Sequence, residues 1–76
     1  MSADKLVYMA NQIGKFFAAQ GKHDEAKAVE GIATHLRRFW DPRMRGEIIA
    51  RMQSGDISGL DPLPRRAVER LAAEQS

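Results

Sequence analysis

The sequence predicts an all-α fold of three to four short helices, in a single domain over residues 1–76. Apolar residues recur at spacings of three and four along most of the chain, which is typical of amphipathic helices. Two Asp-Pro pairs, at 41–42 and 61–62, have the pattern of a capping residue followed by a first helical residue. No segment alternates apolar and polar residues with β-branched enrichment, so strands are not expected.

The first two helices are expected at about 4–19 and about 24–39. Gly21 is expected to end the first helix in the left-handed conformation, and Asp24 and Glu25 favour the start of the second. The apolar stripe of the first consists of Leu6, Met9, Ala10, Ile13, Phe16 and Phe17. The stripe of the second consists of Ala26, Val29, Ile32, Ala33, Leu36 and Phe39.

The third and fourth helices are expected at about 42–53 and about 62–73. The residue before a proline avoids the helical region, so the second helix should end near Trp40 and the third should begin at Pro42. Ser54-Gly55-Asp56 interrupts the third. The apolar positions are Met44, Ile48, Ile49 and Met52 in the third helix and Leu63, Ala67, Val68 and Leu71 in the fourth.

Composition and motifs argue against chemistry within this chain. The sequence has no Cys, so disulfides and thiolate metal sites are excluded. Neither His23 nor His35 has a second metal ligand at helical spacing, and the glycines occur singly rather than in a phosphate-binding loop. We therefore expect no catalytic, cofactor-binding or metal-binding residues.

Charge and hydropathy limit the partners and the location. Twelve basic and ten acidic residues give a net charge of +2, which is small for a nucleic-acid-binding domain. No apolar run approaches the roughly 18 residues of a membrane span, and the N-terminal residues lack the pattern of a signal peptide. A cytoplasmic protein without nucleic-acid or membrane partners is expected.

The segment from His35 to Arg45 has the composition of a protein interface. It contains the only Trp, one of three Phe and half of the Arg residues, at the junction of two expected helices. Trp and Arg often anchor interfaces, because rigid rings bury a large area and guanidinium groups pair with carboxylates. Phe39 is expected in the core, whereas Trp40 fits core and interface equally. The arginines fit contacts with a protein partner, a solvated surface, or an anion-binding site.

The apolar surface predicted for the helices is broader than one small core requires. Phe16 and Phe17 lie about 100° apart on a helix, so one should face the core and the other its flank. Further apolar side chains lie on or beside the main stripes: Val7, Tyr8, Ile49 and Met52. We predict a continuous exposed apolar patch of more than about 400 Å².

Two segments, 9–17 and 31–45, resemble the small delta subunit of cytoplasmic NAD-dependent, molybdenum-containing formate dehydrogenases. The resemblance covers most of residues 5–52, and the segment Leu60-Asp61-Pro62-Leu63 is also similar to the family. Its most specific element is the string Phe39-Trp40-Asp41-Pro42-Arg43-Met44-Arg45.

The resemblance implies a non-catalytic accessory subunit. In this family the complex oxidises formate at a molybdenum cofactor in the large alpha subunit, and iron–sulfur clusters and FMN carry the electrons to NAD⁺. The implied partner is the alpha subunit, and through it the beta and gamma subunits, with an effect on assembly or stability. Together with the interface composition, this leads us to expect partner binding by Phe17, Arg38, Phe39, Trp40, Asp41, Pro42, Arg43, Met44 and Arg45.

Two other functions are compatible with parts of the sequence. An assembly factor that handles the molybdenum cofactor would use arginines to bind its pyrophosphates, and the candidates are Arg37, Arg38, Arg43 and Arg45. A helix-turn-helix DNA-binding protein would need polar base-reading residues, whereas the third helix offers Met and Ile. The DNA-binding hypothesis is therefore disfavoured.

Overall fold

The computed structural model describes residues 3–75, which form four helices. They are α1 (Ala3–Gln20), α2 (Glu25–Phe39), α3 (Pro42–Ser54) and α4 (Pro62–Gln75). Residues 3–75 contain no strand, and the predicted all-α class is confirmed.

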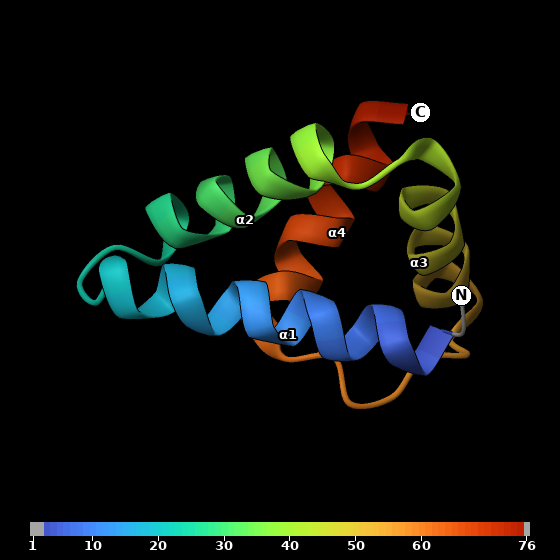
Figure 1. Cartoon of the computed structure of the whole chain (residues 1–76), viewed down its shortest axis with the longest axis horizontal. Coiled ribbons are helices and arrows are strands. Elements are labelled where there is room, and N and C mark those ends of the chain that lie inside the picture. Colours follow the sequence, from blue (N-terminus) through green and yellow to red (C-terminus); the bar gives the residue numbers. More distant parts are fainter. Residues whose placement is uncertain (1–2, 76) are drawn as a thin grey trace.

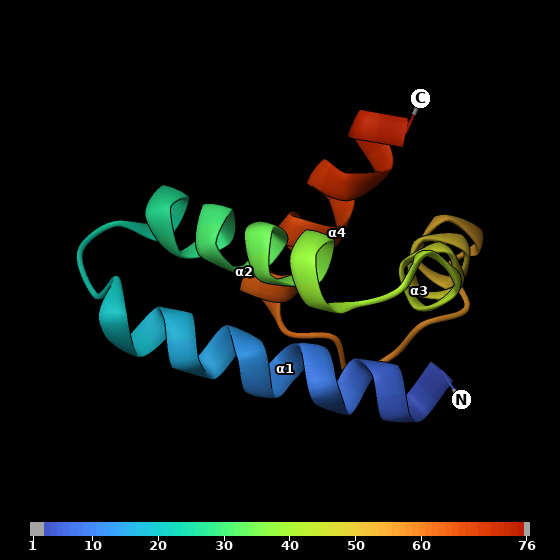
Figure 2. The ribbon, with the colours of Figure 1, turned by 45° about the horizontal axis from the view of Figure 1, so that its top comes forward.

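The helices α1 and α2 form an antiparallel hairpin that opens toward α3 (Figure 1). Helix α4 crosses this hairpin on one side and packs most extensively on α2, and α3 packs on α1 and α4 beyond the open end (Figure 2). The core lies where the four helices meet. Its fully buried members include Leu6, Val29, Ile32, Leu36, Ile48 and Val68.

Side-chain caps define the starts of α2 and α3. The Asp24 carboxylate accepts the backbone N–H of Lys27 at 3.0 Å, which satisfies one of the unpaired donors at the helix start. Asp41 accepts the N–H of Met44 at 2.9 Å in the same way, directly before Pro42. The Asp-Pro pair at 41–42 therefore has the capping role that the sequence predicts.

Gly21 does not adopt the left-handed conformation that we expected. Its N–H donates to the carbonyl of Phe17 at 2.9 Å, and its own carbonyl accepts the N–H of Asp24 at 3.0 Å. These two bonds close the turn without a positive φ, which among the described residues occurs only at Gly55 and Gly59. The prediction was wrong because the end of α1 continues directly into a hydrogen-bonded turn.

The buried face of α2 also differs from the expected stripe, at its first position and at Phe39, which is exposed. Ala26 is exposed, and Ala28 is buried instead. The turn after α1 covers this position, since a Cβ added to Gly21 would lie 3.4 Å from the Cβ of Ala28.

Three ion pairs join α2 to α4 across their outer edge. Glu25 pairs with Arg66 at 3.4 Å, and Arg37 pairs with Glu74 at 2.8 Å. Between them, Glu30 pairs with Arg70. Glu25 and Glu30 are the only acidic residues of α2, so both of its carboxylates are turned toward α4.

Candidate partner-binding surface

The junction of α2 and α3 separates two adjacent aromatic residues. Phe39 is 71% exposed, whereas Trp40 is 5% exposed and belongs to the core. Phe39 is the last helical residue of α2, while Trp40 has extended backbone (φ −88°, ψ 138°), which takes its side chain out of the helical register. The expectation of Phe39 in the core was therefore wrong, and Trp40 occupies the core position.

Arg45 lies at the same junction and contacts the end of α2. Its Nη1 donates to the carbonyl of Arg37 at 3.2 Å, to that of Leu36 at 3.4 Å, and to that of Trp40. The last carbonyls of a helix lack intrahelical partners and carry partial negative charge. A guanidinium group at this end donates hydrogen bonds to the carbonyls and offsets their negative charge. The charge of Arg45 is thus used within the chain.

Arg37 is also engaged within the chain. Its Nε and Nη2 donate to the two carboxylate oxygens of Glu74 at 2.9 and 2.8 Å, which is a bidentate arrangement. These hydrogen bonds lower the pKa of Glu74 from its ordinary 4.5 and raise that of Arg37. The four arginines considered for binding a pyrophosphate therefore do not form one free cluster.

The other residues that the sequence predicts to bind a partner either contribute to the fold or are exposed. Asp41 caps α3, and Met44 is half-buried against the core. Arg38, Pro42 and Arg43 are exposed. No hydrogen bond or ion pair joins Arg38 or Arg43 to another residue of the described range 3–75.

Four rings, Phe16, Phe17, His35 and Phe39, form a continuous series from α1 to α2, which we call the aromatic row. Successive ring centroids are 5.1, 6.2 and 4.7 Å apart along this series. The two terminal rings are exposed, Phe16 by 57% and Phe39 by 71%, and the two middle rings are half-buried. Of the adjacent phenylalanines, Phe17 faces the core and Phe16 its flank, as the sequence predicts.

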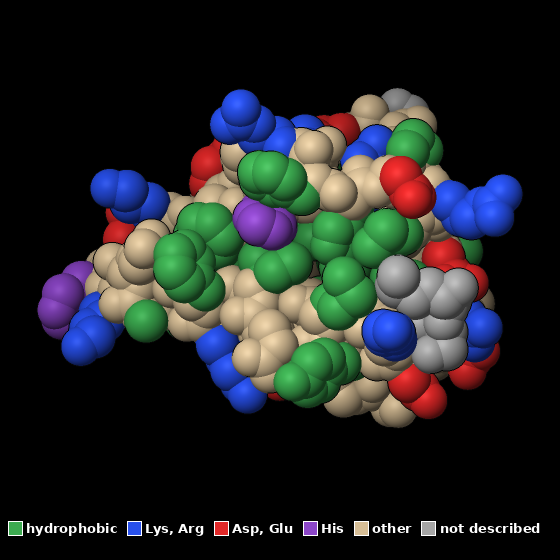
Figure 3. All heavy atoms as spheres, in the orientation of Figure 1, with side chains coloured by type: hydrophobic (Ala, Val, Ile, Leu, Met, Phe, Trp, Pro, Cys, Tyr) green, Lys and Arg blue, Asp and Glu red, His purple; other side chains and the backbone are tan. Residues whose placement is uncertain are grey.

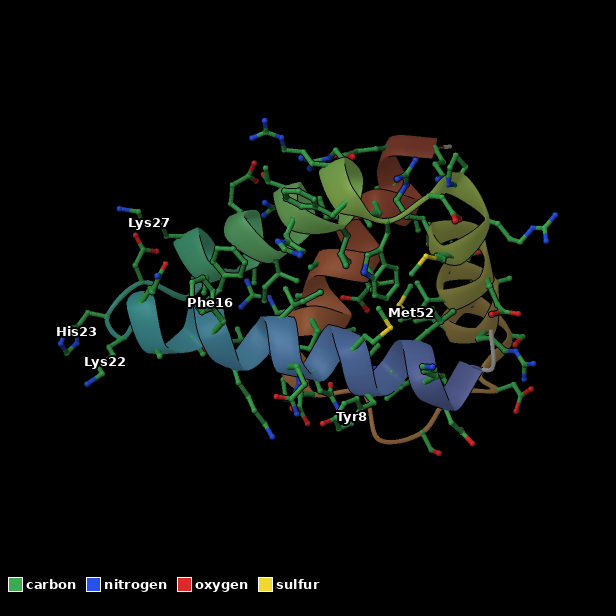
Figure 4. All side chains as sticks on the ribbon, in the orientation of Figure 1. Tyr8, Phe16, Lys22, His23, Lys27 and Met52 are labelled. Atoms are coloured by element: carbon green, nitrogen blue, oxygen red, sulfur yellow. The ribbon has the colours of Figure 1, made fainter. Side chains whose placement is uncertain are left out.

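The aromatic row lies on one face of the hairpin. Hydrophobic side chains gather there around a central histidine (Figure 3), which is His35 because His23 lies at the tip of the turn (Figure 4). Phe16 points into the space between α1 and α2, whereas Tyr8, 64% exposed, lies on the opposite side of α1 (Figure 4). Of the apolar side chains predicted beside the main stripes, Tyr8 is exposed and Met52 is half-buried, whereas Val7 and Ile49 lie in the core, so the prediction was wrong for these two. The continuous area of the patch stays a prediction.

A pocket of 350 Å³ opens along the row and is lined by Gln12, Ile13, Phe16, Phe17 and His35. Its floor depends on Gly31 of α2. A Cβ at Gly31 would lie 2.5 Å from Cδ1 of Phe17, so the Phe17 ring rests directly against the α2 backbone. The pocket is therefore built on a fixed contact between two helices.

Two members of the aromatic row, Phe16 and His35, are absent from the partner-binding residues that the sequence predicts. The signal for His35 was its position four residues before Phe39, which puts both side chains on one side of α2. The signal for Phe16 was its position beside Phe17, with one of the two rings necessarily turned outward.

The chain offers no thiolate ligands for the iron–sulfur clusters that the resemblance implies for the complex. Iron–sulfur clusters require thiolates, and the sequence has no Cys. Within residues 3–75, no group of three or more His, Asp or Glu side chains is arranged to hold a metal ion. Over the same residues, no helix has the length and apolar character that crossing a membrane requires.

A comparison with protein-family models identifies the family to which the chain belongs. The model of the NADH-dependent formate dehydrogenase delta subunit, FdsD, matches residues 5–68, which include both the aromatic row and the α2–α3 junction. Searches of the curated proteins and of the solved structures find no match. The family model covers most of the chain, and the protein therefore belongs to the delta subunits of NADH-dependent formate dehydrogenase.

Proposed function

We propose that this delta subunit is non-catalytic and binds the large alpha subunit of formate dehydrogenase, supporting the assembly or stability of the complex. The observation that carries the proposal is that a member of this family leaves two phenyl rings of one face, those of Phe16 and Phe39, more than half exposed. Exposed apolar surface of this kind is typical of a chain that is completed by a partner.

The physical basis of the proposed effect is mass action. A partner that binds only the folded form stabilises that form, and each subunit of a complex acts in this way on the other. The apolar rings would form the desolvated centre of the interface, with charged groups at its rim. The beta and gamma subunits would be reached through the alpha subunit.

The residue types of the chain support a role without chemistry of its own. It offers no thiolates, and its described part offers no metal-binding cluster. In this proposal the molybdenum cofactor, the iron–sulfur clusters and FMN are held by the other subunits.

The experiment is expression of the formate dehydrogenase complex with and without this chain. With the chain, the purified complex should contain it in a fixed ratio to the alpha subunit. Without it, the yield of complex and its half-life on heating should fall, while the activity per molybdenum of the assembled enzyme stays unchanged. Equal yield and half-life would contradict the proposal, and so would loss of activity per molybdenum in an intact complex.

A second candidate is an assembly factor that handles the molybdenum cofactor during maturation. It is favoured by Arg38 and Arg43, two exposed cations that could meet a pyrophosphate. It is weakened by Arg37 and Arg45, which are engaged within the chain. The composition of the purified complex separates the two functions, because a subunit remains in the active enzyme and a maturation factor leaves it.

A further inference from the structure

We propose that the aromatic row is the surface that meets the alpha subunit, and that the alpha subunit presents there an apolar helix or loop flanked by carboxylates. This inference rests on the proposed function, and it locates the docking site along the α1–α2 hairpin rather than on Trp40, Arg43 and Arg45.

The shape of the row suits an inserted apolar side chain. The exposed rings of Phe16 and Phe39 stand at its ends, and the 350 Å³ pocket opens between α1 and α2. Because the Phe17 ring rests on Gly31 and contacts His35, the floor of the pocket exists before binding. A preformed site avoids part of the entropic cost of ordering side chains on association.

The charges around the row are positive. Lys27 lines a 170 Å³ pocket together with Phe17 and Gly31, and Arg38 is exposed beside Phe39.

Negative charges near the row are already engaged in the structure. Asp24 and Asp41, at the two ends of α2, both accept backbone N–H groups as helix caps. The acidic residues within α2, Glu25 and Glu30, pair with arginines of α4. Lys27 and Arg38 are thus left to be matched from outside, and carboxylates at the rim of the partner would do so.

The same charges argue against a second copy of this chain as the occupant. Two copies that met through this face would bring two cationic rims together, and like charges across an interface are unfavourable. A larger subunit with an acidic rim meets both the apolar and the electrostatic requirement.

The test uses the complex, with a tagged alpha subunit co-expressed with variants of this chain. In the double variant Phe16→Ser and Phe39→Ser, two exposed rings are removed, so the helical circular dichroism and the melting temperature should be retained. Recovery of the chain with the alpha subunit should fall at least about tenfold, on the scale of interface hot spots. The matched control is Tyr8→Ser, which removes a comparably exposed ring outside the row and should leave recovery unchanged.

Charge-reversal variants test whether carboxylates of the partner lie around the aromatic row. Arg38→Glu should slow association with the alpha subunit several-fold at low salt, and added salt should reduce the difference. Lys22→Glu makes the same change at the tip of the turn, away from the row (Figure 4), and should have a smaller effect.

The outcomes separate this inference from the function on which it rests. If the unmodified chain is not recovered with the alpha subunit, the proposed function fails. If the unmodified chain and the Phe16 and Phe39 double variant are recovered equally, the proposed function stands and the aromatic row is excluded as the docking site. The inference is also overturned if Tyr8→Ser loses recovery equally, or if the double variant alters only self-association in sedimentation.

Discussion

The side-chain oxygen of Asn11 accepts the backbone N–H of Asp61 at 2.9 Å, and so ties α1 to the residue that precedes α4. The amide nitrogen of the same side chain donates to the carbonyl of Gly59 at 2.8 Å. One side chain thus uses both of its polar atoms to fix the loop between α3 and α4, which has no regular secondary structure from 56 to 61. These two hydrogen bonds help to hold the start of α4 against α1.

Replacing Asn11 should therefore destabilise the fold. In Asn11→Leu the partly buried N–H of Asp61 loses its acceptor, at a cost of about 1–3 kcal/mol. Urea unfolding followed by circular dichroism measures the change. Gln12→Leu, at the exposed neighbouring position, should stay within about 0.5 kcal/mol. Equal losses in the two variants would contradict the role of Asn11.

The two aromatic residues at the α2–α3 junction should respond in opposite ways to truncation. Trp40→Ala removes a buried ring and should lower the free energy of unfolding by about 3–5 kcal/mol. Phe39→Ala removes an exposed ring and should change it by less than about 0.5 kcal/mol. Thermal melts of the two isolated variants decide this. A stable Trp40→Ala chain would show that the indole is not part of the core.

Arg45 should contribute to stability through its contacts with the end of α2. Arg45→Ala leaves the carbonyls of Leu36 and Trp40 without this donor, and we expect a loss of about 1–2 kcal/mol. Arg43→Ala removes the same charge from an exposed position on the same helix and serves as the control. The comparison is made by chemical denaturation, and a larger loss for Arg43→Ala would reverse the assignment.

Changing either of two helical glycines to alanine should alter the free energy of unfolding, in opposite directions. At Gly14 an added Cβ would lie 2.9 Å from Cδ of the buried Pro64, so Gly14→Ala should destabilise the chain by about 1–3 kcal/mol. At Gly46 nothing lies within 4 Å, so Gly46→Ala should stabilise α3 by about 0.5–1 kcal/mol. A melting temperature of Gly14→Ala equal to or above that of the unmodified chain would contradict the close packing of α1 on α4.

The ion pair between Arg37 and Glu74 predicts that the free energy of unfolding depends on pH. Hydrogen bonding to Arg37 lowers the pKa of Glu74 in the folded chain. Its contribution to stability is therefore present above the pKa of the unfolded chain and is lost as the pH falls through the folded value. The stability difference between the unmodified chain and Glu74→Gln should narrow from pH 7 to about pH 3. A gap that widens in acid would contradict the prediction.

The sequence was sufficient for the helices because their signals are local. Asp41 before Pro42 specifies a capped helix start within a few residues, and Gly55 with its φ of 79° ends α3 at the break that the sequence indicates. The buried stripe of α2 follows from spacing, with Val29, Ile32 and Leu36 on one face. The family resemblance, carried mainly by residues 39–45, was equally a property of the sequence.

The candidate site was only partly predictable, because spacing does not say where a helix packs. Both Phe39 and Trp40 continue the apolar face of α2, and only the extended backbone at position 40 sends the indole into the core and leaves the phenyl ring outside. The sequence does not distinguish Arg37, Arg43 and Arg45. Packing places Glu74 beside Arg37 and the C-terminal end of α2 beside Arg45.

By itself, the sequence determined four helices, the capped start of α3 at Asp41 and the membership of the chain in its family, since each is encoded within a few neighbouring residues. Tertiary structure alone decided which apolar and cationic side chains remain for a partner. Exposure and pairing depend on residues far apart in the chain, such as Phe17 against Gly31 and Arg37 against Glu74, and those meet only when the helices pack.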